Sequence, residues 1–134
     1  MKKINDKGLL SIQIDGNNEM KVVFKPINGT VWMDRNELCG LFGCYMKEID
    51  RCIGDIFEKN MLRVEETCKY HIVAGGRRIS YDITAVNLTV IITIAFQLAT
   101  PQAKTLKMWL VERFVKMKCL DVPLFDIGQN FLLN

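Results

Sequence analysis

The chain has 134 residues, of which 49% are hydrophobic and 25% are charged, so a disordered chain is excluded and a single globular domain is expected. The formal net charge is only +3, so any contact with nucleic acid must depend on where the charges lie. The most apolar segment, Val86–Ala95, is far shorter than the ~20 residues that span a bilayer, and the start lacks the apolar run of a signal peptide. We therefore expect a cytoplasmic protein without a membrane partner.

A β-hairpin is predicted near the N-terminus. Leu9–Ile14 and Met20–Phe24 are rich in β-forming residues, and the segment Asp15–Asn18 between them contains Asp-Gly, which favours a hairpin turn. Val31–Met33 is expected to add a third short strand before the next element.

Two short helices joined by a tight turn are predicted over residues 34–60. Asp34 is expected to cap the first helix, and Glu37 is placed to bond back to the amide of Asp34, which is a variant of the capping box. Gly43 stands at the turn, where a left-handed backbone conformation is required and glycine adopts it without steric cost.

The second of these helices is predicted to be amphipathic. Its apolar residues recur at helical spacing, and those between them should face outward, where a DNA-reading helix-turn-helix carries its recognition residues. The residues expected on this outer face are Tyr45, Lys47, Glu48, Asp50 and Arg51. Of these, Tyr45, Lys47 and Arg51 are the candidate contacts to bases or phosphates.

A second hairpin is predicted from Thr67–Val73 and Arg77–Thr84, with its turn at Ala74–Gly76. Arg77 and Arg78 follow that turn directly. A basic hairpin after a helix-turn-helix has the layout of a wing whose tip contacts phosphates. The alternative is a solvated hairpin whose arginines serve only solubility.

Two helices are expected to complete the domain. The first covers Ala85–Leu98, and the second begins with Thr100 as N-cap and Pro101 in its first turn. The apolar stripe of the second helix consists of Ala103, Leu106, Leu110, Phe114 and Met117. We divide the chain into a domain over residues 1–120 and an apolar tail over 121–134. That tail packs on its own domain, pairs with another copy or leads into a longer chain.

The sequence lacks the patterns of common catalytic and cofactor sites. It has neither a phosphate-binding glycine loop nor a nucleophile elbow, and His71 is its only histidine, so we expect neither an enzyme nor a cofactor. The five cysteines are interpreted as reduced and mostly buried. A zinc site that includes Cys68 and His71 is the alternative, although no second closely spaced pair completes it.

Several segments resemble the virulence RhuM family over about residues 31–118. They are Thr30-Val31-Trp32-Met33 with Glu37-Leu38 and Leu41-Phe42, then Ile49-x-Arg51-x-Ile53-x-x-Ile56-Phe57, then Asn87-Leu88-x-Val90-Ile91-Ile92, and a helix with Ala103, Leu106 and Trp109. Pro101, Ala103-Lys104 and Trp109 are also similar to Bro-N-type phage antirepressor domains. The resemblance implies a DNA-binding or regulatory domain of bacterial or phage origin.

These observations together predict an α+β, winged helix-turn-helix-like domain with an N-terminal β-hairpin and two packed C-terminal helices. The predicted function is a DNA-binding regulatory domain that reads double-stranded DNA with its second helix and a basic wing. Glu48, Asp50 and Asp55 depart from the neutral or basic residues usual in RhuM-like chains, and acids repel phosphates. The alternative is therefore an antirepressor-like module that uses the same scaffold to bind a protein or a second copy of itself.

Overall fold

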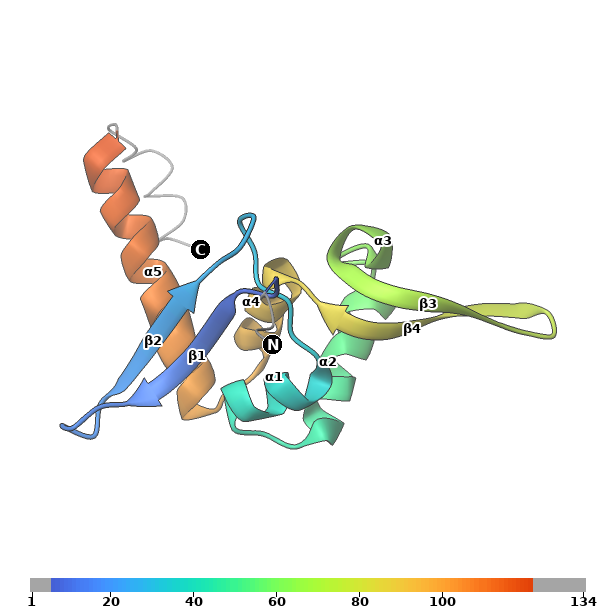
Figure 1. Cartoon of the computed structure of the whole chain (residues 1–134), viewed down its shortest axis with the longest axis horizontal. Helices are drawn as coiled ribbons and strands as arrows, with labels where there is room; N and C mark the ends of the chain where they lie inside the picture. Colours follow the sequence, from blue (N-terminus) through green and yellow to red (C-terminus); the bar gives the residue numbers. More distant parts are fainter. Residues whose placement is uncertain (1–5, 122–134) are drawn as a thin grey trace, which may run out of the picture.

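The computed structural model describes residues 6–121, with side chains to residue 117, as a mixed α+β fold of two small antiparallel sheets and five helices. In chain order the elements are β1 (Leu9–Ile14), β2 (Met20–Lys25), α1 (Arg35–Phe42), α2 (Met46–Glu58), α3 (Val64–Thr67), β3 (Cys68–Gly75), β4 (Arg78–Val86), α4 (Leu88–Gln97) and α5 (Pro101–Asp121). The hairpin β1–β2 lies along α5, whereas β3–β4 projects from the opposite end of the molecule (Figure 1). We call β3–β4 the arm. Within residues 6–121, no helix combines the length and the apolar character needed to cross a membrane.

The N-terminal hairpin is confirmed. Its strands pair antiparallel, with Leu10 opposite Phe24 on the face that packs against the core. The carboxylate of Asp15 accepts hydrogen bonds from the amides of residues 17 and 19 at 2.8 and 3.0 Å, and Asn18 takes the left-handed conformation with φ 64°. The polar loop therefore fixes the turn through one side chain and one asparagine.

The two-helix unit is also confirmed, with the caps that were expected. The carboxylate of Asp34 accepts the amide N–H of Glu37 at 2.8 Å, and the carboxylate of Glu37 accepts the amide N–H of Asp34 at 2.9 Å. Gly43 has φ 64°, and a Cβ there would lie 2.5 Å from Nε2 of Gln102 at the start of α5. Glycine is thus required at this turn both for its backbone conformation and for the close approach of α5.

The third strand was expected over Val31–Met33, but the structure has only a single bridge there. Met33 exchanges both backbone hydrogen bonds with Val86, at 3.0 and 2.9 Å. This pairing keeps Val86 in β4, so the helix predicted from Ala85 begins three residues later, at Leu88. Asn87 caps it by accepting the amide N–H of Val90 at 3.3 Å.

The start of α5 agrees with its prediction, but its far end departs from it. The hydroxyl of Thr100 accepts the amide N–H of Ala103 at 3.2 Å, and the apolar stripe is buried at Ala103 and Leu106. Met117 was expected on the same stripe, yet its side chain is 62% exposed. The helix extends beyond the body that covers its first half (Figure 1). The expected tail lies outside the described residues from position 122 onward.

One hydrophobic core joins the helices to both hairpins. Its fully buried large side chains are Phe42, Leu38, Ile49, Ile56, Ile91, Ile94, Leu106, Val31, Val86, Val90 and Cys52. The arm contributes to this core only at its base, through Cys68, Ile83 and Val86. The core therefore fixes α2 firmly and holds the arm by one end.

Candidate nucleic-acid interface

The helix α2 has one buried and one exposed face. Ile49, Cys52, Ile53 and Ile56 form the buried face. Tyr45, at the N-cap position, is 82% exposed and makes no capping hydrogen bond through its side chain. The expected outer face is thus solvent-accessible, because burying four apolar residues at helical spacing turns the polar residues between them outward.

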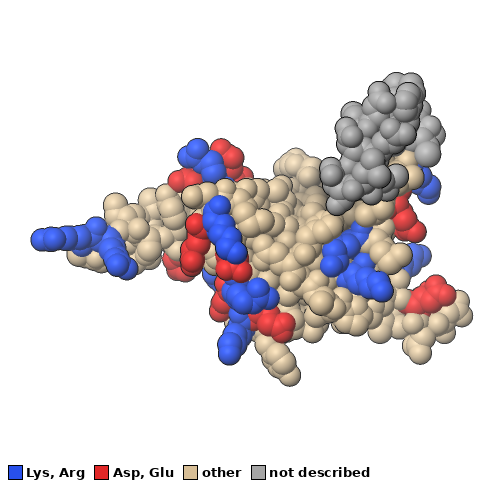
Figure 2. Space-filling view, turned by 180° about the vertical axis from the view of Figure 1, so that it is seen from behind, with Lys and Arg blue, Asp and Glu red and all other residues tan. Residues whose placement is uncertain are grey.

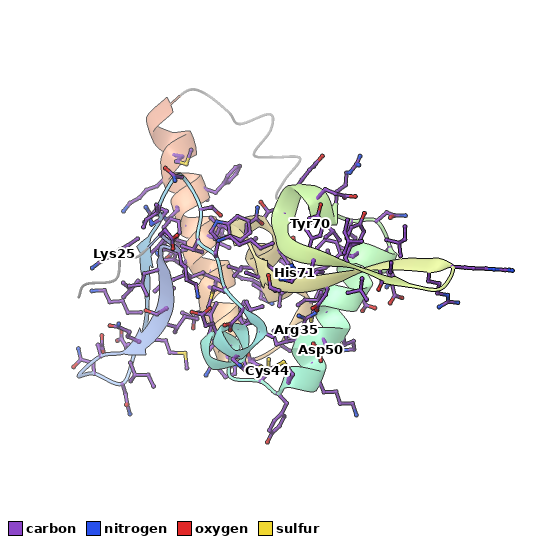
Figure 3. All side chains as sticks on the ribbon, turned by 45° about the vertical axis from the view of Figure 1, so that its right-hand side comes forward. Lys25, Arg35, Cys44, Asp50, Tyr70 and His71 are labelled. Carbon is purple, nitrogen blue, oxygen red and sulfur yellow. The ribbon has the colours of Figure 1, made fainter. Side chains whose placement is uncertain are left out.

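Two ion pairs involve charged side chains of this outer face. The Nε of Arg35 in α1 lies 2.8 Å from Oδ1 of Asp50, and the two side chains approach each other between α1 and α2 (Figure 3). Arg51 lies 3.7 Å from Asp55 one helical turn later. Lys47 takes part in none of the ion pairs found among residues 6–117. Exposed pairs of this kind contribute about 0–1 kcal/mol, so a stronger anionic partner could displace them.

Arg35 also connects α2 to the arm. Its Nη1 donates a hydrogen bond of 2.6 Å to the carbonyl oxygen of Ile83, while its Nε holds Asp50. One guanidinium thus joins α1, α2 and the base of the arm, using the several donors that arginine presents in a fixed plane. No spacing in the sequence relates Arg35 to either partner, because the partners are 15 and 48 residues away.

The tip of the arm is basic and fully exposed. The turn lies at Gly76 and Arg77, with φ 63° at Gly76. It shares Gly76 with the predicted turn at Ala74–Gly76, but it begins two residues later and ends one residue later. Arg77 sits in the turn itself, and Arg78 begins β4. Basic side chains gather at this tip, whereas acidic and basic side chains are mixed over the middle of the same view (Figure 2).

The candidate contacts therefore fall in two separate places. Tyr45, Lys47 and Arg51 follow α2 at the body of the molecule. Arg77 and Arg78 lie at the far end of the arm, which points away from that helix (Figure 1). A ligand that touches both must be long, as a nucleic-acid duplex or a second protein is.

The cysteines near α2 have no features of a reactive or ligating site. Burial raises the pKa of Cys39, Cys52 and Cys68, and burial with the nearby charge of Glu48 raises the pKa of Cys44 to about 11. These thiols are protonated at neutral pH, and the thiolate is the form that attacks electrophiles and binds metals.

The zinc alternative finds no support in the described part of the chain. Cys68 is buried at the base of the arm, whereas His71 is exposed three residues further along the same strand. Residues three apart in a strand point to opposite faces. Among residues 6–117, no group of three or more histidine, cysteine or acidic side chains could hold a metal ion.

Comparison of the chain with protein-family models, with curated proteins and with solved structures gives no match.

Proposed function

We propose that this chain is a DNA-binding regulatory domain of the phage or mobile-element type, comparable to RhuM-like proteins. The observation that carries the proposal is the pairing of an exposed second helix, which follows a capped first helix and the turn at Gly43, with a projecting hairpin whose tip is basic. In helix-turn-helix proteins the second helix enters the major groove, and basic groups beside it hold the phosphate backbone.

Each candidate side chain has a distinct task in this proposal. Tyr45 and Lys47 stand at the start of α2, which is the end of a recognition helix that contacts base edges. Arg51 binds phosphate after releasing Asp55, since a phosphate is the stronger partner for a guanidinium. Arg77 and Arg78 bind phosphates at the tip of the arm, which serves as the wing.

The pairing of Asp50 with Arg35 is important for this function. An acid on a DNA-facing helix repels phosphate by about 1 kcal/mol at contact distance in water. The guanidinium of Arg35 lies 2.8 Å from Asp50 and offsets that repulsion. Asp50 then remains available to accept a hydrogen bond from a cytosine amino group.

The proposal predicts salt-dependent binding in which the arm contributes to affinity but not to sequence choice. The double variant Arg77→Ala/Arg78→Ala should bind random-sequence duplex DNA more weakly, and its slope of log K against log salt should be smaller by about two units. Fluorescence anisotropy at several salt concentrations measures both quantities. Lys21→Ala/Lys25→Ala, on β2 at the other end of the molecule, is the matched control. Equal binding by the two double variants would remove the arm from the interface.

A protein-binding role is the second candidate, and the charge of α2 favours it. The helix carries two basic residues, Lys47 and Arg51, against four acidic ones. Under this alternative the same exposed face binds a protein, as antirepressors bind repressors. A salt-independent, weak DNA interaction in the anisotropy experiment would favour it over DNA binding.

A further inference from the structure

The arm has one face that is entirely apolar or aromatic. Cross-strand partners share a face of a hairpin, and the pairs Tyr70–Ile83, Ile72–Tyr81 and Ala74–Ile79 alternate with polar pairs. We call the surface made by these six residues the apolar face of the arm. It bears no charged group from its base to its tip. The opposite face carries His71, Val73, Arg78, Ser80 and Asp82.

The apolar face lies uncovered along most of its length. Ile83 at the base is 8% exposed, but exposure rises to 43% at Tyr81 and to 72% at Ile79 near the tip. Ile72 is 63% exposed. A two-stranded hairpin by itself is marginally stable in water, and it normally needs a third strand or a packed element to cover its hydrophobic side. The described residues supply that cover only at the base, where α3 packs on β3 and Tyr70 lies close to it (Figure 3).

A groove continues the apolar face into the body of the molecule. It has a volume of about 650 Å³ and runs between the second half of α2, the segment around α3 and the base of the arm. Phe57, Leu62, Tyr81 and Ile83 are among its apolar lining. Its charged lining residues are Glu58, Glu65 and Arg63, so acidic groups outnumber basic ones.

The two ends of this surface carry opposite charge. The tip of the arm is basic through Arg77, while Glu58 and Glu65 border the groove at the base. A surface that is apolar along its length, basic at one end and acidic at the other is complementary to its own copy turned by a two-fold rotation. Such self-complementarity is what a symmetric dimer requires.

We infer that two copies of this chain pair through their arms. The arms lie antiparallel, apolar face against apolar face, and each tip enters the groove at the base of the other arm. Arg77 of one copy then meets Glu58 and Glu65 of the second copy. A strand of eight residues is only about 26 Å long, and a stable interface buries about 800 Å² per partner, so both the arm and the groove are needed.

This dimer leaves Arg78 free for other contacts. Arg78 belongs to the polar face of the arm, which points away from the second copy in this arrangement. Arg77 cannot bind phosphate while the second copy holds it, so in the dimer the tip keeps only the phosphate contact of Arg78, and the slope change expected for the Arg77→Ala/Arg78→Ala variant falls to about one unit. A dimer also suits the two-fold symmetry of many operators.

The oligomeric state of the full chain provides the main test. Sedimentation equilibrium across a range of protein concentrations should give a dimer for the native chain. The variant Ile72→Asp/Ile79→Asp should raise the dimer dissociation constant by at least about 100-fold, because four apolar side chains at the interface become charged. The matched control His71→Asp/Ser80→Asp adds the same two acids to the opposite face of the arm and should remain dimeric. Circular dichroism melts establish that both variants fold.

A charge exchange tests the antiparallel geometry. Arg77→Glu should weaken self-association, since like charges then meet at both ends, and so should Glu58→Arg/Glu65→Arg. An equimolar mixture of these two variants should form a mixed dimer, because opposite charges then meet at both contacts. At one contact the new acid at position 77 faces the new arginines at positions 58 and 65, and at the other the native Arg77 faces the native Glu58 and Glu65. Light-scattering mass of the mixture measures the recovery.

Three results would overturn the inference. They are a native chain that stays monomeric at every concentration, equal loss of the dimer in the control variant, and charge variants that dimerise as tightly as the native chain. If DNA rather than a second copy covers the apolar face of the arm, the native chain should be a monomer, and the Ile72→Asp/Ile79→Asp variant should bind DNA more weakly than the native chain. A native chain that forms the dimer but does not bind DNA would contradict the proposed function and would leave the inferred dimer unaffected.

Discussion

The two hairpins of this protein have similar patterns but different surroundings. In β1–β2, the face containing Leu10 and Phe24 is packed against the core and α5, and the rings of Phe24 and Trp109 lie 5.5 Å apart in an edge-on contact. In the arm, the equivalent face from Ile72 to Ile79 meets no element of the described chain along its outer half. Alternation of apolar residues therefore determines which side of a hairpin is apolar, whereas a separate element determines whether that side is buried.

The largest expected effect is the difference in stability loss when a large aliphatic side chain is truncated in each of the two hairpins. Leu10 is 5% exposed, so Leu10→Ala should lower the free energy of unfolding by about 3 kcal/mol through lost burial and a cavity. Ile79→Ala should change it by less than about 0.5 kcal/mol when the protein is monomeric, because that side chain is mostly solvated. Urea denaturation at low protein concentration measures both. Equal losses would show that the outer arm is covered within one chain.

Substitutions in the turn of β1–β2 and in the turn of the arm should have effects of intermediate size on stability. Asp15→Ala removes hydrogen bonds to two backbone amides and should lower the free energy of unfolding by about 1 kcal/mol. Gly76→Ala imposes a side chain at φ 63°, with a local cost of about 1 kcal/mol. Because the arm is held only at its base, we expect this change to speed amide hydrogen exchange at the tip and to leave global unfolding nearly unchanged. A matching fall in global stability would contradict independent opening of the arm.

The smallest effect concerns pH at the base of the arm. The hydroxyl of Tyr81 donates to Glu65 at 2.7 Å, which lowers the pKa of Glu65 and raises the pKa of Tyr81. The lowered pKa of Glu65 stabilises the fold above about pH 4.5, and this contribution is lost as the pH falls through the lowered pKa. The raised pKa of Tyr81 stabilises the fold below about pH 10, and this contribution is lost as the pH rises through the raised pKa. Tyr81→Phe should return the pKa of Glu65 toward its ordinary value in an NMR titration. An unchanged Glu65 pKa in that variant would rule out the hydrogen bond in solution.

Local signals in the sequence were sufficient for the helices whose ends are fixed by neighbouring residues. The capping box at Asp34, the turn at Gly43 and the cap at Thr100 each involve groups within a few residues of one another. The start of α4 has a local signal too, since Asn87 caps the helix through the amide of Val90, and the prediction missed it. The bridge between Met33 and Val86, which extends β4 to residue 86, depends on tertiary contact and leaves no local signal. The four-residue helix α3 was also missed, since one turn is too short for a hydrophobic period to show.

The candidate site was less predictable than the fold. The exposure of Tyr45, Lys47 and Arg51 follows from helical spacing and agrees with the structure. The bonds of Arg35 to Asp50 and to Ile83 depend on tertiary contact and leave no trace in local spacing. The apolar face of the arm was partly visible in the alternation of Tyr70 and Ile72, but Val73 on the other face obscured it.

The position of Arg35 has a consequence for how the molecule meets anything large. A single planar group bonded to both α2 and the base of the arm resists changes in the angle between them. These bonds act at the base of the arm, where they maintain its direction relative to α2. A partner large enough to contact both α2 and the arm therefore meets two surfaces whose relative orientation is set at Arg35.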